Sequence, residues 1–322
     1  MRNFISIFIF GGLFISACDD RIDIQVDPFL SKPVVYCMID PNDSVHYIRI
    51  GRVFSGLQPP AISAREQDSL LFSNVSVKVR LNPFPTGGKA DSVQADPVPE
   101  AAKDQGYFAS QGHRVYRFVN QNLARYHSLR VEVEIPGLPT ARASCRIIGA
   151  PVIWSPNSAQ KFIYIVPDNP LRIQWSGGQW NEVDIQFQIR ELYADSLATR
   201  IIRIQKVNDV QLNGKYYEIK IPYELLVQRI GQLMKPANGL IRRYFGPVNF
   251  TIHTGLEEYA RYMEFQDGIN DFNSNPFSNI ENGLGLLSSR SSVKKGPMEI
   301  DQDSRMELAA DPVLARLGFI EY

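Results

Sequence analysis

The chain consists largely of short segments in which apolar and polar residues alternate, as they do in strands with one buried face. In "VHYIRIGR", His46, Ile48 and Ile50 fall on one face, and Tyr47 and Arg49 fall on the other. The same period recurs in "NVSVKVRLN", "RVYRFV", "YHSLRVEVEIPG" and "ARASCRII". Turn-forming residues bound these segments, so the first half of the chain is predicted to be a succession of β-strands.

These strands extend to about residue 150, where Pro151 and Pro156 mark a boundary. About seven short strands in a stretch of this length favour an immunoglobulin-like sandwich, which we place at residues 27–150. Within it, residues 83–105 are rich in Pro, Gly, Asp and Ala and are expected to form a loop.

Beyond the boundary, "PLRIQWSGGQWNEVDIQFQIREL" predicts a hairpin, because apolar residues alternate on both sides of its Gly pair. Its L-x-I-x-W strand and alternating partner resemble fibronectin type III sandwiches. Further strands are predicted in "TRIIRIQKV", "KYYEIKI" and "PVNFTIHT". The expected fold class is therefore mainly β: two β-sandwich domains, immunoglobulin-like and then fibronectin type III-like, the second over residues 151–322, with a few inserted helices.

Two segments interrupt the β pattern with apolar residues at helical spacing. A helix is predicted near residues 222–235, with the apolar stripe Leu226, Ile230, Leu233 and Met234. A second is predicted near residues 255–267, with the stripe Leu256, Tyr259, Ala260 and Met263. Both stripes indicate core packing rather than a cofactor site. The C-terminal tail is expected to be partly helical.

The N-terminus has the features of an export signal. Arg2 precedes an apolar run over residues 4–14, too short for a permanent transmembrane helix of about 20 residues. The next residues, "ISAC", match the lipobox of bacterial lipoproteins, in which the Cys thiol accepts a diacylglyceride. We therefore predict a signal peptide at residues 1–17, lipidation of Cys18 by diacylglyceride and a fatty acid such as palmitate, and a tether at residues 18–26.

Lipidation of Cys18 leaves two thiols, Cys37 and Cys145, each in a strand-like segment. In an exported protein these can form a disulfide, and they can equally remain a pair of buried free thiols. Both alternatives stay open. Four serines match the Asp-Ser-apolar motif for O-glycosylation in exported Bacteroidota proteins: Ser44, Ser69, Ser92 and Ser196.

Charge and motifs argue against several function classes. The 34 basic and 34 acidic side chains balance, so nothing indicates nucleic-acid binding. The sequence has no G-x-S-x-G elbow, H-E-x-x-H helix, Walker loop or dinucleotide-binding glycine pattern, and its four histidines are scattered. We therefore expect no enzyme activity, no cofactor and no metal site. An unrecognised hydrolase site is the least favoured alternative.

Two glycine- and oxygen-rich stretches fail specific tests for ligand sites. "DGINDFNSNP" begins like an EF-hand loop, but Pro276 and Asn282 stand where Gly and Glu are required. "ENGLGLL" lacks the Walker spacing and is followed by strand-like residues rather than a helix. Trp180 follows the turn "SGG" and is the best candidate for a contact with a glycan ligand. A surface glycan-binding module is thus the second hypothesis.

The C-terminal half holds the most specific segment of the chain. A helix with Tyr259 and Tyr262 leads into "NIENGLGLL", with Asn279, Asn282, Gly283 and Gly285 in the pattern NI-x-NG-x-G-x-(F/L). Together with the lipobox and the early strands, this order resembles a Bacteroidota outer-membrane lipoprotein family catalogued as domain of unknown function 4249. These four residues are expected to be structural. The tail after about Ser292 is longer than in the family, and its role is left open.

The resemblance implies a location and a kind of activity. Members of the family look like lipoproteins associated with TonB-dependent transporters, and no catalytic residues carry over. Asp19 and Asp20 directly follow Cys18, which resembles the signal for export to the cell surface. The first hypothesis is therefore an outer-membrane accessory lipoprotein, lipid-anchored and facing the cell surface or the periplasm. It would bind a transporter, or another outer-membrane complex, without catalysing a reaction.

Overall fold

The computed structural model describes residues 31–53, 60–85, 87–99, 114–194, 196–207, 211–236, 241–267 and 277–321. The predicted signal peptide, Cys18 and the tether lie outside these ranges. In the described part strands dominate, the sheets form two sandwiches, and helices are few. The predicted class, a mainly β protein of two sandwiches with a few helices, is confirmed.

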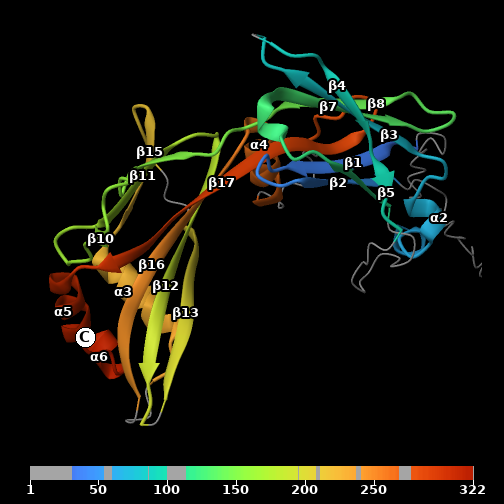
Figure 1. Cartoon of the computed structure of the whole chain (residues 1–322). Coiled ribbons are helices and arrows are strands. Elements are labelled where there is room, and N and C mark those ends of the chain that lie inside the picture. The colour runs from blue at the N-terminus through green and yellow to red at the C-terminus, as the bar shows by residue number, and fades with distance from the viewer. Residues whose placement is uncertain are drawn as a thin grey trace, which may run out of the picture.

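The first sandwich packs two sheets around one hydrophobic core (Figure 1). One sheet has the strand order β4-β3-β7-β8, and the other runs β17-β1-β2-β6-β5, in which β17 spans Leu284–Ile300. Val77, Val79 and Leu81 of β3 are fully buried and lie opposite three buried aliphatic residues of β7, as the alternation predicts. The strands are β1 (Pro33–Ile39), β2 (Val45–Arg52), β3 (Ser76–Pro83), β4 (Asp91–Gln94), β5 (Asp96–Pro97), β6 (Val115–Val119), β7 (Tyr126–Glu134) and β8 (Ala141–Arg146). Three short helices accompany them: α1 (Pro60–Ser63), α2 (Gln67–Leu70) and the 3-10 helix η1 (Leu123–Arg125).

Two of these strands, β4 and β5, lie in the stretch that we expected to be a loop. The Ala95 N–H donates to the Val77 carbonyl at 2.9 Å, and the Val98 N–H donates to the Val115 carbonyl at 2.8 Å. Ala95 and Val98 are both buried. The segment therefore crosses from one sheet to the other. The loop prediction was wrong for residues 91–97 because their Pro, Asp and Ala content concealed strands of two to four residues.

The second sandwich packs the sheet β14-β15-β11-β9 against β13-β12-β16-β17. Both strands of the predicted hairpin, β11 and β12, are present, but they do not pair: β11 lies between β15 and β9, and β12 lies between β13 and β16 in the opposite sheet. The hairpin prediction was wrong because the turn between these strands carries the chain from one sheet to the other, and alternation alone does not distinguish the two arrangements. Ile173, Trp175 and Phe187 are fully buried, as the alternation predicts. The indole N–H of Trp175 donates to Asn181 Oδ1 at 2.8 Å. The strands are β9 (Val152–Ser155), β10 (Phe162–Ile163), β11 (Leu171–Ser176), β12 (Trp180–Leu192), β13 (Leu197–Val207), β14 (Gln211–Asn213), β15 (Tyr216–Ile221) and β16 (Arg242–Gly255).

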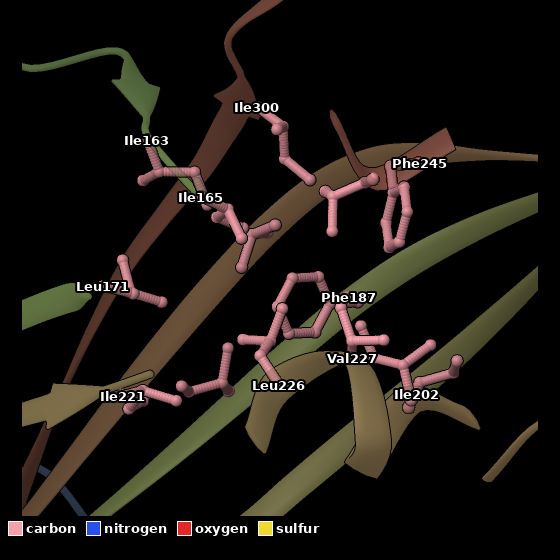
Figure 2. Close-up of a cluster of buried hydrophobic side chains, with 14 of the residues drawn as sticks. Ile163, Ile165, Leu171, Phe187, Ile202, Ile221, Leu226, Val227, Phe245 and Ile300 are labelled. Carbon is pink, nitrogen blue, oxygen red and sulfur yellow. The ribbon is translucent and has the colours of Figure 1, made fainter. Parts of the chain in front are cut away.

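Helix α3 (Tyr223–Leu233) closes one side of this second core. Figure 2 shows Leu226 and Val227 directed toward Phe187 of β12. Leu233, which we placed in the buried stripe, is 51% exposed, and Val227 is buried instead. The helix ends at Leu233, so this side chain extends beyond the last turn that packs on the sheet.

Strand β17 (Leu284–Ile300) belongs to both sandwiches. Its residues 284–289 pair in parallel with β1, and its residues 290–298 pair in antiparallel with β16. Figure 1 shows this strand running without a break from one sandwich into the other. Leu256, Ile280 and Leu287 accordingly lie in the first core. The predicted division at residue 150 therefore does not separate the cores, because a late segment of the chain completes the first sandwich.

The C-terminal tail folds onto the second core as α5 (Gln302–Ala310) and α6 (Pro312–Arg316). Leu308 and Leu314 are fully buried. The side chain of Arg243 is 3% exposed and fixes the tail: its guanidinium donates to the Leu317 carbonyl at 2.6 Å and to Glu191 Oε1 at 2.8 Å. The tail is thus an integral part of the second sandwich.

Candidate functional site

The predicted signature residues lie where the chain enters β17. The Asn279 side chain hydrogen-bonds both backbone groups of Leu287: Nδ2 donates to the carbonyl at 2.7 Å, and Oδ1 accepts from the N–H at 2.9 Å. Asn282 has a φ of 55°, and its Nδ2 donates to the Thr140 carbonyl at 3.1 Å. These bonds fasten the start of β17 to the loop before β8.

The two signature glycines permit a close approach of neighbouring backbone. Gly285 has a φ of 117°, and a Cβ there would overlap the Val35 carbonyl oxygen of β1. A Cβ on Gly283 would lie 2.9 Å from the Pro33 carbonyl oxygen. Any other residue would push β17 away from β1. The signature therefore maintains strand pairing, and its polar side chains are occupied by the backbone.

Trp180, the candidate ligand contact, lies at the junction of the two sandwiches under α4 (Glu257–Asp267). Its ring is partly exposed and packs edge-to-face on Tyr259, with centroids 4.8 Å apart. Tyr36 and Tyr262 form a similar pair at 6.2 Å. Burial raises the pKa of both Tyr259 and Tyr36, so these phenols stay neutral. The four rings hold α4 on the sheet, and that packing takes up part of the Trp180 surface.

The two remaining cysteines face the first core from opposite sheets, Cys37 from β1 and Cys145 from β8. Both are free thiols and buried. Burial raises the pKa of Cys37 to about 12. It also raises the pKa of Cys145 well above its usual value, and the nearby Cys37 raises it further. The structure thus shows the alternative of two buried, protonated thiols.

The four serines of the O-glycosylation motif all reach solvent. Ser44, Ser92 and Ser196 are exposed. Ser69 is partly exposed in α2, where its hydroxyl donates to Glu66 Oε2 at 3.3 Å. The structure brings none of them into a common site, and their modification stays a prediction.

Sequence reasoning missed an aromatic surface on the outer face of the sheet β14-β15-β11-β9. Trp154 of β9 is 49% exposed and Tyr216 of β15 is 39% exposed. Their rings meet at an interplanar angle of 67° with centroids 5.4 Å apart. Strand β11 lies between them and presents only Ser176 there, whose Oγ accepts the Trp154 indole N–H at 3.2 Å. The two rings therefore form a fixed corner above a small residue.

A polar cluster continues this face toward the other end of β11 and β15. Glu218 is 3% exposed, and its Oε1 accepts from Gln174 Nε2 at 3.0 Å. Arg172 and Lys220 pair with the same carboxylate at 3.5 and 3.4 Å. Burial tends to raise the pKa of Glu218, but these three donors outweigh it and the pKa lies below its usual value. The carboxylate thus stays ionised and holds three donor side chains in place.

We refer to Trp154, Tyr216, Ser176, Gln174, Arg172, Lys220 and Glu218 together as the aromatic–polar face. The alternation of "VIWS" was a signal for Trp154, because Ile153 packs on the core and its neighbour must point outward. The signal was incomplete, since only the pairing of β9 and β15 with β11 brings the two rings together.

The described ranges contain no evident catalytic or metal-binding site. There, no three His, Cys, Asp or Glu side chains gather as metal ligands. A cavity of about 350 Å³ is lined in part by Arg52, Asp68 and Arg114, and one of about 420 Å³ lies between α3 and α6. Neither is lined by His or Cys. His46 is buried, and burial lowers its pKa, so it is neutral.

Comparisons with known proteins returned distant structural neighbours. The sequence matches no protein-family model, and it matches no curated protein. A two-domain fibronectin type III segment of chicken tenascin is 8% identical; the match covers 82% of this chain and 98% of that one, with a TM-score of 0.17. Murine CEACAM1b is also 8% identical, over 84% and 100% of the two chains, with a TM-score of 0.16.

A third solved structure, DIP-gamma IG1+IG2, is 6% identical over 84% of this chain and 97% of that one, with a TM-score of 0.19. TM-scores this low support no argument about fold, residues or function. Within the described ranges, every helix is too short or too polar to cross a bilayer.

Proposed function

We propose that the protein is an outer-membrane accessory lipoprotein, anchored through Cys18, that binds a TonB-dependent transporter or another outer-membrane complex without catalysing a reaction. The observation that carries this proposal is the lipobox "ISAC" at the end of a signal-like apolar run, followed by Asp19 and Asp20. The family resemblance of the segment around Asn279 adds the association with a transporter. The sandwich architecture supports it, since such folds present broad, rigid surfaces.

A docking surface for the partner is the outer face of the sheet β4-β3-β7-β8, which we call the basic face. The strand registers place five cations and two carboxylates on it: Lys78, Arg80, Arg130, Arg142, Arg146, Glu132 and Glu134. The whole chain has no net charge, so this face concentrates positive charge.

The placement of these charges lowers the stability of the isolated sheet. Arg80 and Arg130 lie directly opposite each other on neighbouring strands, where like charges destabilise a sheet. Glu132 contacts both, at 2.9 Å and 4.0 Å, and compensates only one of the two charges. An acidic surface on the partner would neutralise the uncompensated positive charge and would speed the association of the two proteins. We therefore assign an acidic docking surface to the partner.

The anchor is tested by fractionating cells that express the wild type or Cys18→Ser. The wild type should sediment with outer membranes and require detergent for release, because its acyl chains insert in the bilayer. The variant should be soluble in the periplasm. Equal sedimentation of both forms would contradict the anchor.

The partner is tested by affinity purification from detergent-solubilised outer membranes, with mass spectrometry of what accompanies the lipoprotein. A transporter or other membrane complex should be recovered with the wild type and largely lost with the double variant Arg80→Ser/Arg130→Ser. The matched control, Arg203→Ser/Lys294→Ser, removes two exposed cations from the second sandwich and should retain the partner. Recovery of the lipoprotein alone from wild-type membranes would refute the proposal.

Two alternatives receive less support from the described residues. A glycan site at Trp180 would need a freely exposed ring, and Tyr259 covers part of this one. A hydrolase would need an activated nucleophile beside a base in a cleft, and neither of the two cavities described above is lined by a His or a Cys.

A further inference from the structure

We propose that the aromatic–polar face of the second sandwich is a carbohydrate-binding site, with Trp154 and Tyr216 stacking on a sugar ring and Arg172, Gln174 and Lys220 binding its polar groups. The occupant that fits is an oligosaccharide with an acidic sugar, such as a uronic acid. This inference goes beyond the accessory function and depends on neither the lipid anchor nor the basic face.

The aromatic end has the shape that a pyranose ring requires. A sugar presents a flat array of C–H groups on one side and hydroxyl groups around its edge, so an exposed aromatic face can stack on it. Trp154 is half exposed, and its hydrogen bond to Ser176 fixes the orientation of the indole. The Tyr216 ring lies at 67° to the indole, so it adds a second aromatic surface and a phenol hydroxyl to the site. Pre-oriented rings lose little conformational freedom on binding.

The fold itself does not account for these exposed rings. Trp175, the next tryptophan along the sheet, is fully buried and holds the core, whereas Trp154 points away from it. Ser176 is the only side chain of β11 between the two rings, and its small size leaves room above it. Val152, 52% exposed, adds apolar surface beside them. Large apolar side chains gathered on an open surface are typical of ligand sites.

The polar end selects for negative charge. Glu218 uses both of its oxygens on its own neighbours, so it holds these side chains rather than a ligand. The side chains of Arg172 and Lys220 are 52% and 47% exposed, and their remaining N–H groups are free to point at solvent. Two cations around one carboxylate leave one net positive charge. A carboxylate on the sugar would therefore be favoured here over a neutral hydroxyl.

A small, partly polar face of this kind suits a glycan better than a protein. Stable protein interfaces bury about 800 Å² on each partner around a well-packed apolar centre. Here two rings and Val152 adjoin a cluster of charged groups. Hydroxyl and carboxylate groups at the edge of a sugar can satisfy such donors directly.

Affinity electrophoresis of the purified mature protein tests the site. Gels containing polygalacturonate or alginate should retard the wild type, and gels containing neutral dextran should do so at least several-fold less. Trp154→Ala and Tyr216→Ala should each weaken the retardation about ten-fold, the loss of one stacking contact. Trp154→Phe keeps a ring and should stay within about three-fold of the wild type. Tryptophan fluorescence should respond to oligogalacturonate in the wild type and not in Trp154→Phe.

The matched control is Phe162→Ala, which removes another aromatic side chain that is also 49% exposed but lies on β10. It should bind like the wild type, and thermal unfolding should show that every variant remains folded. The proposal fails if no uronic acid polymer retards the wild type, if Trp154→Ala binds as the wild type does, or if Phe162→Ala loses as much. Equal retardation by dextran would overturn the role given to Arg172 and Lys220. Since the assay needs no membrane or partner protein, its result is separate from that of the accessory function.

Discussion

Removal of the Arg243 guanidinium should release the C-terminal tail from the second sandwich. In the wild type this side chain donates to Glu191 Oε1 at 2.8 Å, to the Lys235 carbonyl at 2.9 Å and to the Leu317 carbonyl at 2.6 Å. Arg243→Met fills much of the same space but leaves the carboxylate and both carbonyls without these donors. The change therefore tests the electrostatic contacts more than the packing.

The expected loss of stability follows from the Glu191 carboxylate that remains buried without Arg243 in the variant. Breaking a buried ion pair from one side costs about 3–5 kcal/mol, because the other charge remains buried. Arg200 stays 3.3 Å from Glu191 but is half exposed, so it compensates in part. We therefore expect a loss of about 3 kcal/mol in the free energy of unfolding for Arg243→Met. Arg243→Met/Glu191→Leu removes the stranded charge and should recover about half of that loss.

Urea unfolding followed by circular dichroism measures both variants against the wild type. A loss below about 1 kcal/mol for Arg243→Met would refute the role of this contact. A double variant as unstable as the single one would show that the stranded Glu191 charge is not the cause.

The same pair gives a pH dependence. Burial tends to raise the pKa of Glu191, but its hydrogen bond to Arg243, the Arg200 and Arg243 charges and Tyr193 outweigh burial, and the pKa lies below its usual value. A carboxyl with a lowered folded-state pKa adds stability above its unfolded pKa of about 4.3 and loses it as the pH falls through the folded value. Stability should therefore fall more steeply below about pH 4 in the wild type than in Glu191→Gln.

Three further predictions concern the first sandwich. Gly285→Ala places a Cβ against the Val35 carbonyl of β1 and should lower the free energy of unfolding by at least about 3 kcal/mol, whereas a loss under about 1 kcal/mol in urea would contradict the close approach. Leu287→Ala should cost about 2–5 kcal/mol, measured in the same way, and a cost near zero would place β17 outside the first core. Cys37 and Cys145 should not react with an aromatic disulfide reagent at pH 8 in the native protein and should both react in denaturant; no reaction in denaturant would reveal a disulfide.

Many of the strands were predictable because a strand with one buried face shows an alternation of apolar and polar residues in its own sequence. His46, Ile48 and Ile50 are buried while Tyr47 is 53% exposed, as the alternation of β2 indicates. The same rule worked for strands β11 and β12 of the second sandwich, although it did not reveal that they lie in opposite sheets. It requires only that the inner face be apolar and the outer face polar.

In strand β17 the local sequence pattern no longer predicts burial. Ser288, Ser289 and Ser291 are buried, although a polar residue predicts exposure. Ser289 Oγ accepts the Ile148 N–H at 3.2 Å, and Ser291 Oγ accepts from Asn42 Nδ2 at 3.1 Å. These partners are distant in sequence, so no local rule reveals that Ser289 and Ser291 can be buried at low cost.

The candidate surfaces depend on register in the same way. Trp154 and Tyr216 are 62 positions apart in the sequence, and only the order β15-β11-β9 makes them neighbours. The opposed pair Arg80 and Arg130 likewise exists only in the β3–β7 register. The glycine-containing segment around Gly285, by contrast, was identified from sequence as structural, because its spacing failed the tests for phosphate and calcium sites.

The mass of the N-terminal peptide tests the central claim most directly. Protein extracted from outer membranes with detergent, digested and analysed by mass spectrometry, should begin at Cys18 and carry a diacylglyceride on its thiol and an acyl chain on its amino group. A peptide that begins at Cys18 with this lipid mass establishes the anchor on which the proposed function depends. An unmodified Cys18, or a chain that retains residues 1–17, would contradict it.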